Sequence, residues 1–119
     1  MDSIENIVPD WAFRTNCAIT VADATCRIIY MNERSRQTFA ARGGEALIGH
    51  NLMEYHNERS QAIIRRLLAE GSTNAYTIEK EGVRKMIFQS AWFDAEGAVA
   101  GLVEISMVIP AEMPHYVRN

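Results

Sequence analysis

The chain has 119 residues, a length that suits one domain and is too short for two well-filled cores. Apolar residues make up 48% and charged residues 23%, so the composition is that of a globular protein rather than a disordered one. A net charge of −3 gives no basis for nucleic-acid or membrane-surface binding, and no apolar run approaches the roughly 20 residues that cross a bilayer. The N-terminus is acidic, unlike a secretory signal, so we expect a cytoplasmic protein with neither nucleic acid nor membrane among its partners.

The N-terminal residues predict a helical segment ahead of the main fold. An apolar stripe at helical spacing consists of Ile4, Ile7, Val8 and Trp11. Pro9 either interrupts this helix or begins a second short one. The stripe either forms a dimer contact or covers the protein's own sheet. We assign residues 1–15 as a helical cap and dimerisation segment.

Two short β-prone runs follow this segment. Residues 18–23 and 27–31 are apolar, and a polar turn separates them, which predicts a hairpin. Asn32 is a good N-cap for a helix that continues to about Arg42. Gly43 ends that helix, because glycine adopts a positive φ at little cost.

Two short helical pieces and one longer helix come next. Residues 45–48 and 51–55 each predict a single turn. Asn57 is a plausible cap for the clearest helix of the chain, which ends at Gly71. Its apolar side chains, at helical spacing, are Ile63, Ile64, Leu67 and Leu68.

After Gly71 the sequence pattern changes to the two-residue period of strands, over residues 75–80, 83–93 and 98–109. Alternation places Phe88, Ser90 and Trp92 on one face, and Val103 and Ile105 likewise share a face. The proline-containing residues 110–119 form a tail. The element order predicts an α+β fold over residues 16–109, a five-stranded antiparallel sheet with short helices on one face.

This order, with particular residues at the joints, resembles the PAS domain family. The pieces that carry the resemblance are Asp23 before a turn, an apolar strand ending in Asn32, the Leu47-Ile48-Gly49 sequence, and the Asp94-to-Gly97 turn. The family usually has glycine where this chain has Cys26. The match covers about residues 10–109. The chain is similar to small stand-alone PAS proteins without an attached output domain.

The resemblance implies a hydrophobic pocket between the sheet and the helices. Its expected wall residues are Tyr30, Met31, Phe39, Met53, His56, Tyr76, Phe88, Ser90, Trp92, Val103 and Ile105. Such pockets hold a small molecule, a cofactor or nothing, and a pocket filled by the protein's own side chains is the alternative to ligand binding.

Cofactor binding makes specific demands on the sequence. His56, just before the long helix, is the candidate axial ligand for heme, and its alternative role is a structural hydrogen bond at the helix entry. A covalent flavin needs an Asn-Cys-Arg motif on a helix. Asn16-Cys17-Ala18 lacks the arginine and begins a strand, so no cofactor is firmly implied.

Motifs typical of enzymes are missing from the sequence. There is no Gly-x-Ser-x-Gly elbow, no His-Glu-x-x-His and no phosphate-binding loop. We therefore expect a non-catalytic sensory module that binds a small molecule, forms a homodimer and signals to a separate output protein. A heme-based gas or redox sensor using His56 and a purely structural interaction domain are the alternatives.

Overall fold

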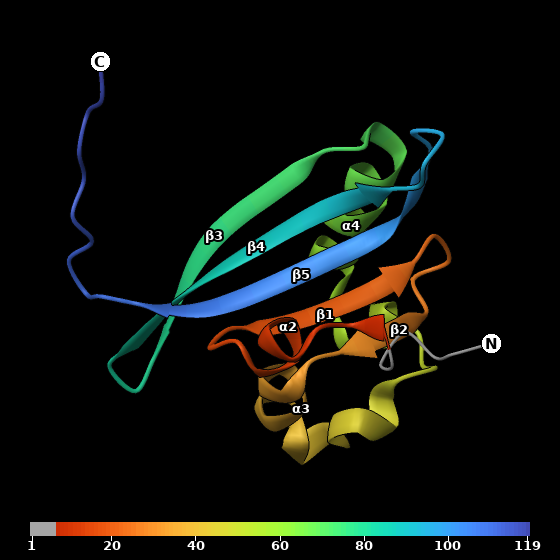
Figure 1. The fold of residues 1–119 in the computed structure, drawn as a ribbon, viewed down its shortest axis with the longest axis horizontal. Coiled ribbons are helices and arrows are strands. Elements are labelled where there is room, and N and C mark those ends of the chain that lie inside the picture. The colour runs from red at the N-terminus through yellow and green to blue at the C-terminus, as the bar shows by residue number, and fades with distance from the viewer. Residues whose placement is uncertain (1–6) are drawn as a thin grey trace.

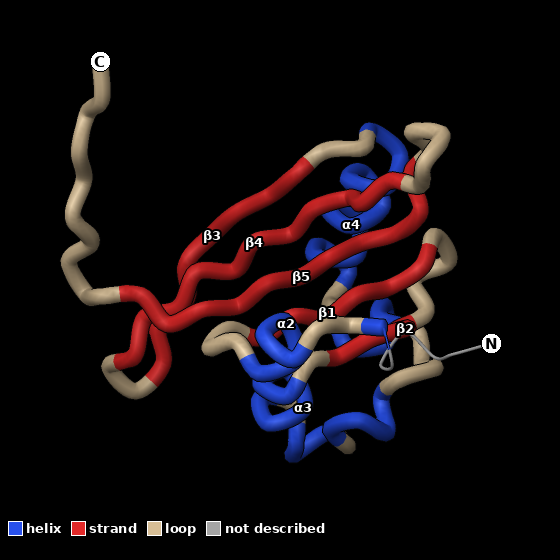
Figure 2. Tube along the Cα trace, in the orientation of Figure 1, coloured by secondary structure: helices blue, strands red, loops and turns tan. Residues whose placement is uncertain are grey.

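The computed structural model describes residues 7–119, so Ile4 of the apolar stripe lies outside the described residues. The chain forms one five-stranded sheet, and its helical elements come between the second and third strands in the sequence, except for one short helix before the first strand (Figures 1 and 2). The strands are β1 (Ala18–Asp23), β2 (Ile28–Met31), β3 (Thr73–Lys80), β4 (Val83–Phe93) and β5 (Val99–Ile109). Their order in the sheet is β2-β1-β5-β4-β3, and every neighbouring pair is antiparallel. This confirms the predicted α+β fold.

The helical elements are short except for one. They are α2 (Asp10–Arg14), α3 (Glu33–Thr38), the 3₁₀ turns η1 (Ala40–Arg42), η2 (Gly44–Leu47) and η3 (Leu52–Tyr55), and α4 (Glu58–Glu70). The predicted helix from Asn32 to Arg42 is thus an α-helix followed by a separate 3₁₀ turn. Within residues 7–119, no helix combines the length and apolar character needed to cross a membrane.

Both predicted asparagine caps are confirmed. Asn32 accepts a hydrogen bond from Ser35 N, and Asn57 accepts one from Ser60 N. Each bond satisfies a backbone donor that the first helical turn leaves free. At the other end of α4, Gly71 takes the left-handed conformation at φ 64° and its N–H donates to Leu67 O.

The β1–β2 turn forms without the glycine that is usual in the family. Cys26 occupies the left-handed region at φ 68°, a conformation that costs a side chain about 1 kcal/mol. Asp23 compensates, because its Oδ1 accepts from Thr25 N at 2.9 Å, Thr25 Oγ1 at 2.7 Å and Arg27 N at 3.0 Å. Cys26 is also buried in the core, which adds apolar burial to the same turn.

Strand pairing determines which residues of β5 face the helices. Leu102 is fully buried and belongs to the same core cluster as Ile64 and Leu67 of α4. Because residues two apart on a strand share a face, Glu104 and Ser106 also face the helices. Val103 and Ile105 therefore lie on the outer face, away from α4.

The same reasoning applies to β4, where Ile87 pairs with Ser106, and Gln89 with Glu104, on the helix side. Phe88, Ser90 and Trp92 lie on the outer face. The expectation that these residues and Val103 face the helices is wrong. Both faces of β4 and β5 carry apolar side chains, so alternation identified residues that share a face but not the face that packs against α4.

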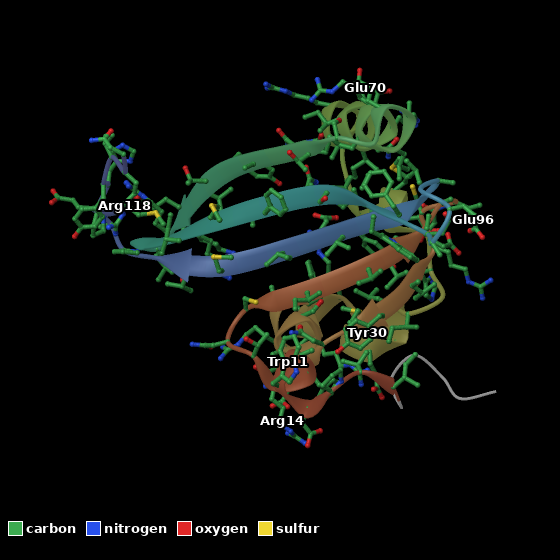
Figure 3. The ribbon with its side chains drawn as sticks, turned by 45° about the horizontal axis from the view of Figure 1, so that its top comes forward. Trp11, Arg14, Tyr30, Glu70, Glu96 and Arg118 are labelled. Atoms are coloured by element: carbon green, nitrogen blue, oxygen red, sulfur yellow. The ribbon has the colours of Figure 1, made fainter. Side chains whose placement is uncertain are left out.

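The two ends of the sheet differ. Glu96 lies in the β4–β5 turn at one end, whereas residues 110–119 extend from the other end, where Figure 3 labels Arg118. Arg84 Nη1 donates a hydrogen bond to Ala111 O at 2.6 Å, which holds the start of this tail beside β4. All side chains from residue 110 onward are exposed.

Candidate ligand cavity

A cavity of about 300 Å³ lies between the inner face of the sheet and the helical elements. Its apolar walls come from Ala18, Ile28, Met31, Phe39, Leu47, Leu52 and Ile87. Ile105, between Glu104 and Ser106 on β5, also borders the cavity, although alternation turns its side chain to the outer face. Its polar or partly polar walls come from Thr20, Thr38, Tyr55, His56, Tyr76, Glu104 and Ser106. A mostly apolar enclosure with a few polar groups is typical of small-molecule sites, and this volume is at the small end of their range.

His56 is held in one orientation at the junction between η3 and α4. Its Nδ1 lies 2.9 Å from Leu52 O, and its Nε2 lies 3.3 Å from Glu104 Oε1. Gln61 Nε2 donates to Met53 O and to His56 O, both at 2.9 Å, which fixes the backbone of the junction. The contact with the Glu104 carboxylate raises the pKa of His56, although partial burial opposes this, so the imidazolium form persists to a higher pH than in a free histidine.

A chain of polar side chains crosses the inner face of the sheet. Asn74 Nδ2 on β3 donates to Gln89 Oε1 on β4 at 3.0 Å, and Gln89 Nε2 reaches Glu104 Oε2 on β5 at 3.4 Å. His56 continues the chain to the backbone of η3. Burial raises the pKa of Tyr76, and the charge of Glu104 raises it further. Three strands and the helical layer are thereby joined by a chain of polar contacts that includes the charged groups of Glu104 and His56.

The structure brings together five of the predicted pocket residues. Met31, Phe39, His56, Tyr76 and Ile105 border the cavity. Two others do not border it: Tyr30 is buried but pairs with Val21 on the outer face of the sheet, and Met53 packs against the core cluster. The remaining four, Phe88, Ser90, Trp92 and Val103, lie on the outer face, where Trp92 Nε1 donates to Ala22 O at 2.9 Å.

Glu104, the charged wall residue, was not among the pocket residues predicted from the sequence, and neither were Gln89 and Ser106. The signal that could have found them is the β5 alternation read in the other phase, because Leu102, Glu104 and Ser106 also share one face. Small residues opposite them on β1, Ala18 and Thr20, leave the space that the cavity occupies.

The residues around His56 do not fit axial ligation of heme. Both ring nitrogens already have partners, Leu52 O for Nδ1 and Glu104 Oε1 for Nε2. An iron on Nε2 would have to take the place of the Glu104 contact. Within residues 7–119, no group of three or more His, Cys, Asp or Glu side chains is arranged to hold a metal ion.

The dimerisation stripe is only partly described. Ile7 is 69% exposed and Trp11, on α2, is 74% exposed, whereas Val8 is half-buried. Figure 3 shows Trp11 and Arg14 at the margin of the molecule. Arg14 Nη1 binds Glu33 Oε2 at 3.0 Å, which ties α2 to α3.

Several solved structures with a similar fold come from proteins described as sensors. A sensory box sensor histidine kinase from Vibrio cholerae has a TM-score of 0.62 at 15% identity, over 82% of this chain and 85% of that one. The Aer2 receptor from Vibrio cholerae, described as a dual PAS-heme oxygen sensor, has a TM-score of 0.59 at 18% identity, over 79% and 95%.

A third similar structure is VqmA bound to DPO, with a TM-score of 0.69 at 14% identity. VqmA is a LuxR-type receptor of Vibrio cholerae. The match covers 90% of this chain but 58% of that one, so VqmA is considerably longer. No curated protein sequence matches this chain significantly.

A family model described as the PAS fold matches residues 13–112, which include all five strands and the helices between them. The sheet order, the helical layer and the enclosed cavity agree with that match. The chain therefore belongs to the PAS domain family.

Proposed function

We propose that this protein is a non-catalytic sensory module that binds a small molecule in the cavity and signals through protein–protein contacts as a homodimer. The observation that carries the proposal is the cavity of about 300 Å³ with an ionisable pair, His56 and Glu104, in its wall. Apolar wall surface left in contact with water costs stability, and the partly buried charged pair costs desolvation. A ligand that fills the space and contacts the pair would offset both costs.

Ligand binding could change how the helical layer packs against the sheet, because the cavity lies between them. The cavity borders α3, η2 and η3 on one side and β1, β4 and β5 on the other. A ligand with different affinity for two packings of these layers would shift the population between them. VqmA, with the same fold, is described as bound to DPO, which supports small-molecule binding by analogy of fold alone.

A pair of cavity-filling variants tests the binding step. Ala18→Phe places a ring in the cavity, whereas Ala95→Phe places the same ring in the exposed β4–β5 turn. We expect small aromatic fragments to shift the methyl NMR signals of Leu52 and Ile87 in the wild type and in Ala95→Phe, but not in Ala18→Phe. No shift in the wild type, or equal shifts in all three proteins, would leave a self-filled pocket and a purely structural interaction role.

The outer face of the sheet supports the homodimer. Over β3, β4 and β5 it carries no helix of the described chain (Figure 1). Its half-buried apolar side chains are Met86, Phe88, Trp92, Val103, Ile105 and Met107. A contiguous apolar face on a sheet marks an interaction surface, and a two-fold axis lets one such patch pair with itself. The same surface, or the leading helical segment, would contact a separate output protein.

Light scattering during size-exclusion chromatography measures the oligomeric state. We expect the wild type to be a dimer and Phe88→Glu, which adds a charge to the outer face, to be a monomer. Ala69→Glu adds the same charge to the exposed side of α4 and should leave the dimer intact. A monomeric wild type, or a dimeric Phe88→Glu, would remove the dimer from the proposal.

A further inference from the structure

The carboxylate of Glu104 is the charged acceptor in the cavity wall. Its Oε1 is buried, and no hydrogen bond of good geometry reaches that atom from residues 7–119. The nearest charged group is His56 Nε2, at 3.3 Å. Its Oε2 has a long hydrogen bond, 3.4 Å, from Gln89. A carboxylate can accept at about four lone-pair positions, so Glu104 has acceptor capacity left beside the cavity.

The hydrogen bond to Leu52 sets the protonation pattern of His56. Leu52 O only accepts, so Nδ1 carries a hydrogen and donates to it. Nε2 faces the Glu104 carboxylate, and this contact is attractive when Nε2 also carries a hydrogen. The pair is then an imidazolium beside a carboxylate, with no net charge.

The charges around the pair leave no excess negative charge for a cationic ligand. Arg42, from the helical side, acts on His56, and Lys85 lies further along the helix-facing side of β4. Tyr76 from β3 adds a neutral hydroxyl near Glu104. A neutral hydrogen-bond donor satisfies the carboxylate without displacing the proton of His56.

The size and the walls of the cavity limit the rest of the ligand. An apolar cavity of about 150 Å³ holds one benzene ring in another protein. The 300 Å³ here therefore suits a molecule of about two fused rings or a comparable compact aliphatic group. Met31, Leu47, Leu52 and Ile87 give that body apolar surroundings.

We propose that the cavity binds a small, neutral, mostly apolar molecule that donates one N–H or O–H group to the carboxylate of Glu104. This inference rests on the proposed ligand-binding function and adds the chemical class of the ligand. His56 is the positioning residue, because it holds the carboxylate against the cavity wall through Nε2 while Leu52 O holds its ring.

Two probes of equal shape test the inference. Indole carries an N–H donor, and benzofuran has an oxygen in its place and no donor. We expect the wild type to bind indole about tenfold or more tightly than benzofuran, the size of a hydrogen bond to a charged group. Glu104→Met should bring the two dissociation constants within about twofold. Glu54→Met, the same substitution on the exposed side of η3, should keep the preference.

A second measurement uses the wild-type protein alone and so does not require any variant to fold. With ¹⁵N-indole bound to the wild type, the indole N–H should show a nuclear Overhauser contact with the Glu104 side chain. Equal affinity for both probes, or an N–H that contacts other residues, would overturn the inference and leave the proposed function standing. Failure of both probes to bind also overturns it, and the two alanine-to-phenylalanine variants then decide separately whether the cavity binds anything.

Discussion

Truncation of the Asn32 side chain to alanine should strongly lower the free energy of unfolding. Its side chain is fully buried at the junction of β1, β2, α2 and α3. Oδ1 accepts from Ser35 N at 3.0 Å and from Ile19 N at 2.9 Å. Nδ2 donates to Cys17 O at 2.9 Å and to Ala12 O at 3.2 Å. One amide thus satisfies two donors and two acceptors of the backbone.

The cost of Asn32→Ala follows from those four contacts. The lost helix cap costs about 1 kcal/mol, and each of the other three hydrogen bonds contributes about 1 kcal/mol net. The expected loss in the free energy of unfolding is about 4 kcal/mol, a large part of the roughly 5–15 kcal/mol of a typical domain. Asn57→Ala is the matched control, because Asn57 is exposed and caps α4 through Ser60 N alone. Its expected loss is about 1 kcal/mol.

Urea unfolding followed by far-ultraviolet circular dichroism measures both variants. A difference of about 3 kcal/mol, at a slope of about 2 kcal/mol per M, separates their midpoints by about 1.5 M. Midpoints within about 0.5 M of each other would refute the idea that the buried amide joins four elements, and would reduce Asn32 to an ordinary helix cap.

Two further predictions concern the pair in the cavity wall and the crossing of β4 and β5. Because the pKa of His56 is raised above 6.5 in the folded state, the contribution of the His56–Glu104 pair to the free energy of unfolding should be fully present below about pH 6.5 and lost as the pH rises through the folded pKa. His56→Gln should make stability less dependent on pH over this range, and NMR titration of the His56 ring should give a midpoint above 6.5. Gly101→Ala should prevent soluble expression, because its Cβ would overlap Ala22 O and lie 2.5 Å from Trp92 Nε1, whereas Gly97→Ala, with nothing within 4 Å, should cost only about 1 kcal/mol through its positive φ.

Local sequence signals predicted most of the fold because each has a local physical cause. The caps at Asn32 and Asn57 and the stop at Gly71 depend on backbone donors and on φ within one turn. The strands β1 and β4 have the predicted bounds, since two-residue alternation and flanking turns identify a strand without knowledge of its partners.

The features that local sequence patterns did not predict depend on tertiary contacts. Cys26 in a left-handed conformation is acceptable because Asp23 and the core both compensate for it. The cavity depends on small β1 residues lying opposite Glu104 and Ser106, a match between strands separated by most of the chain. No local pattern contains the register between β1 and β5.

The distribution of polar and apolar side chains over the two faces of β4 and β5 supports the proposed function. A sheet that only had to pack against α4 would turn its large apolar residues inward, yet here Phe88, Trp92 and Ile105 face outward and Gln89 and Glu104 face the helices. Natural sequences depart from the stable pattern where function requires it. The inward polar residues build a wall that a ligand can contact, and the outward apolar residues build a surface that a second molecule can cover. The same alternation of residues along β4 and β5 therefore provides both the polar cavity wall and the apolar surface for the proposed dimer contact.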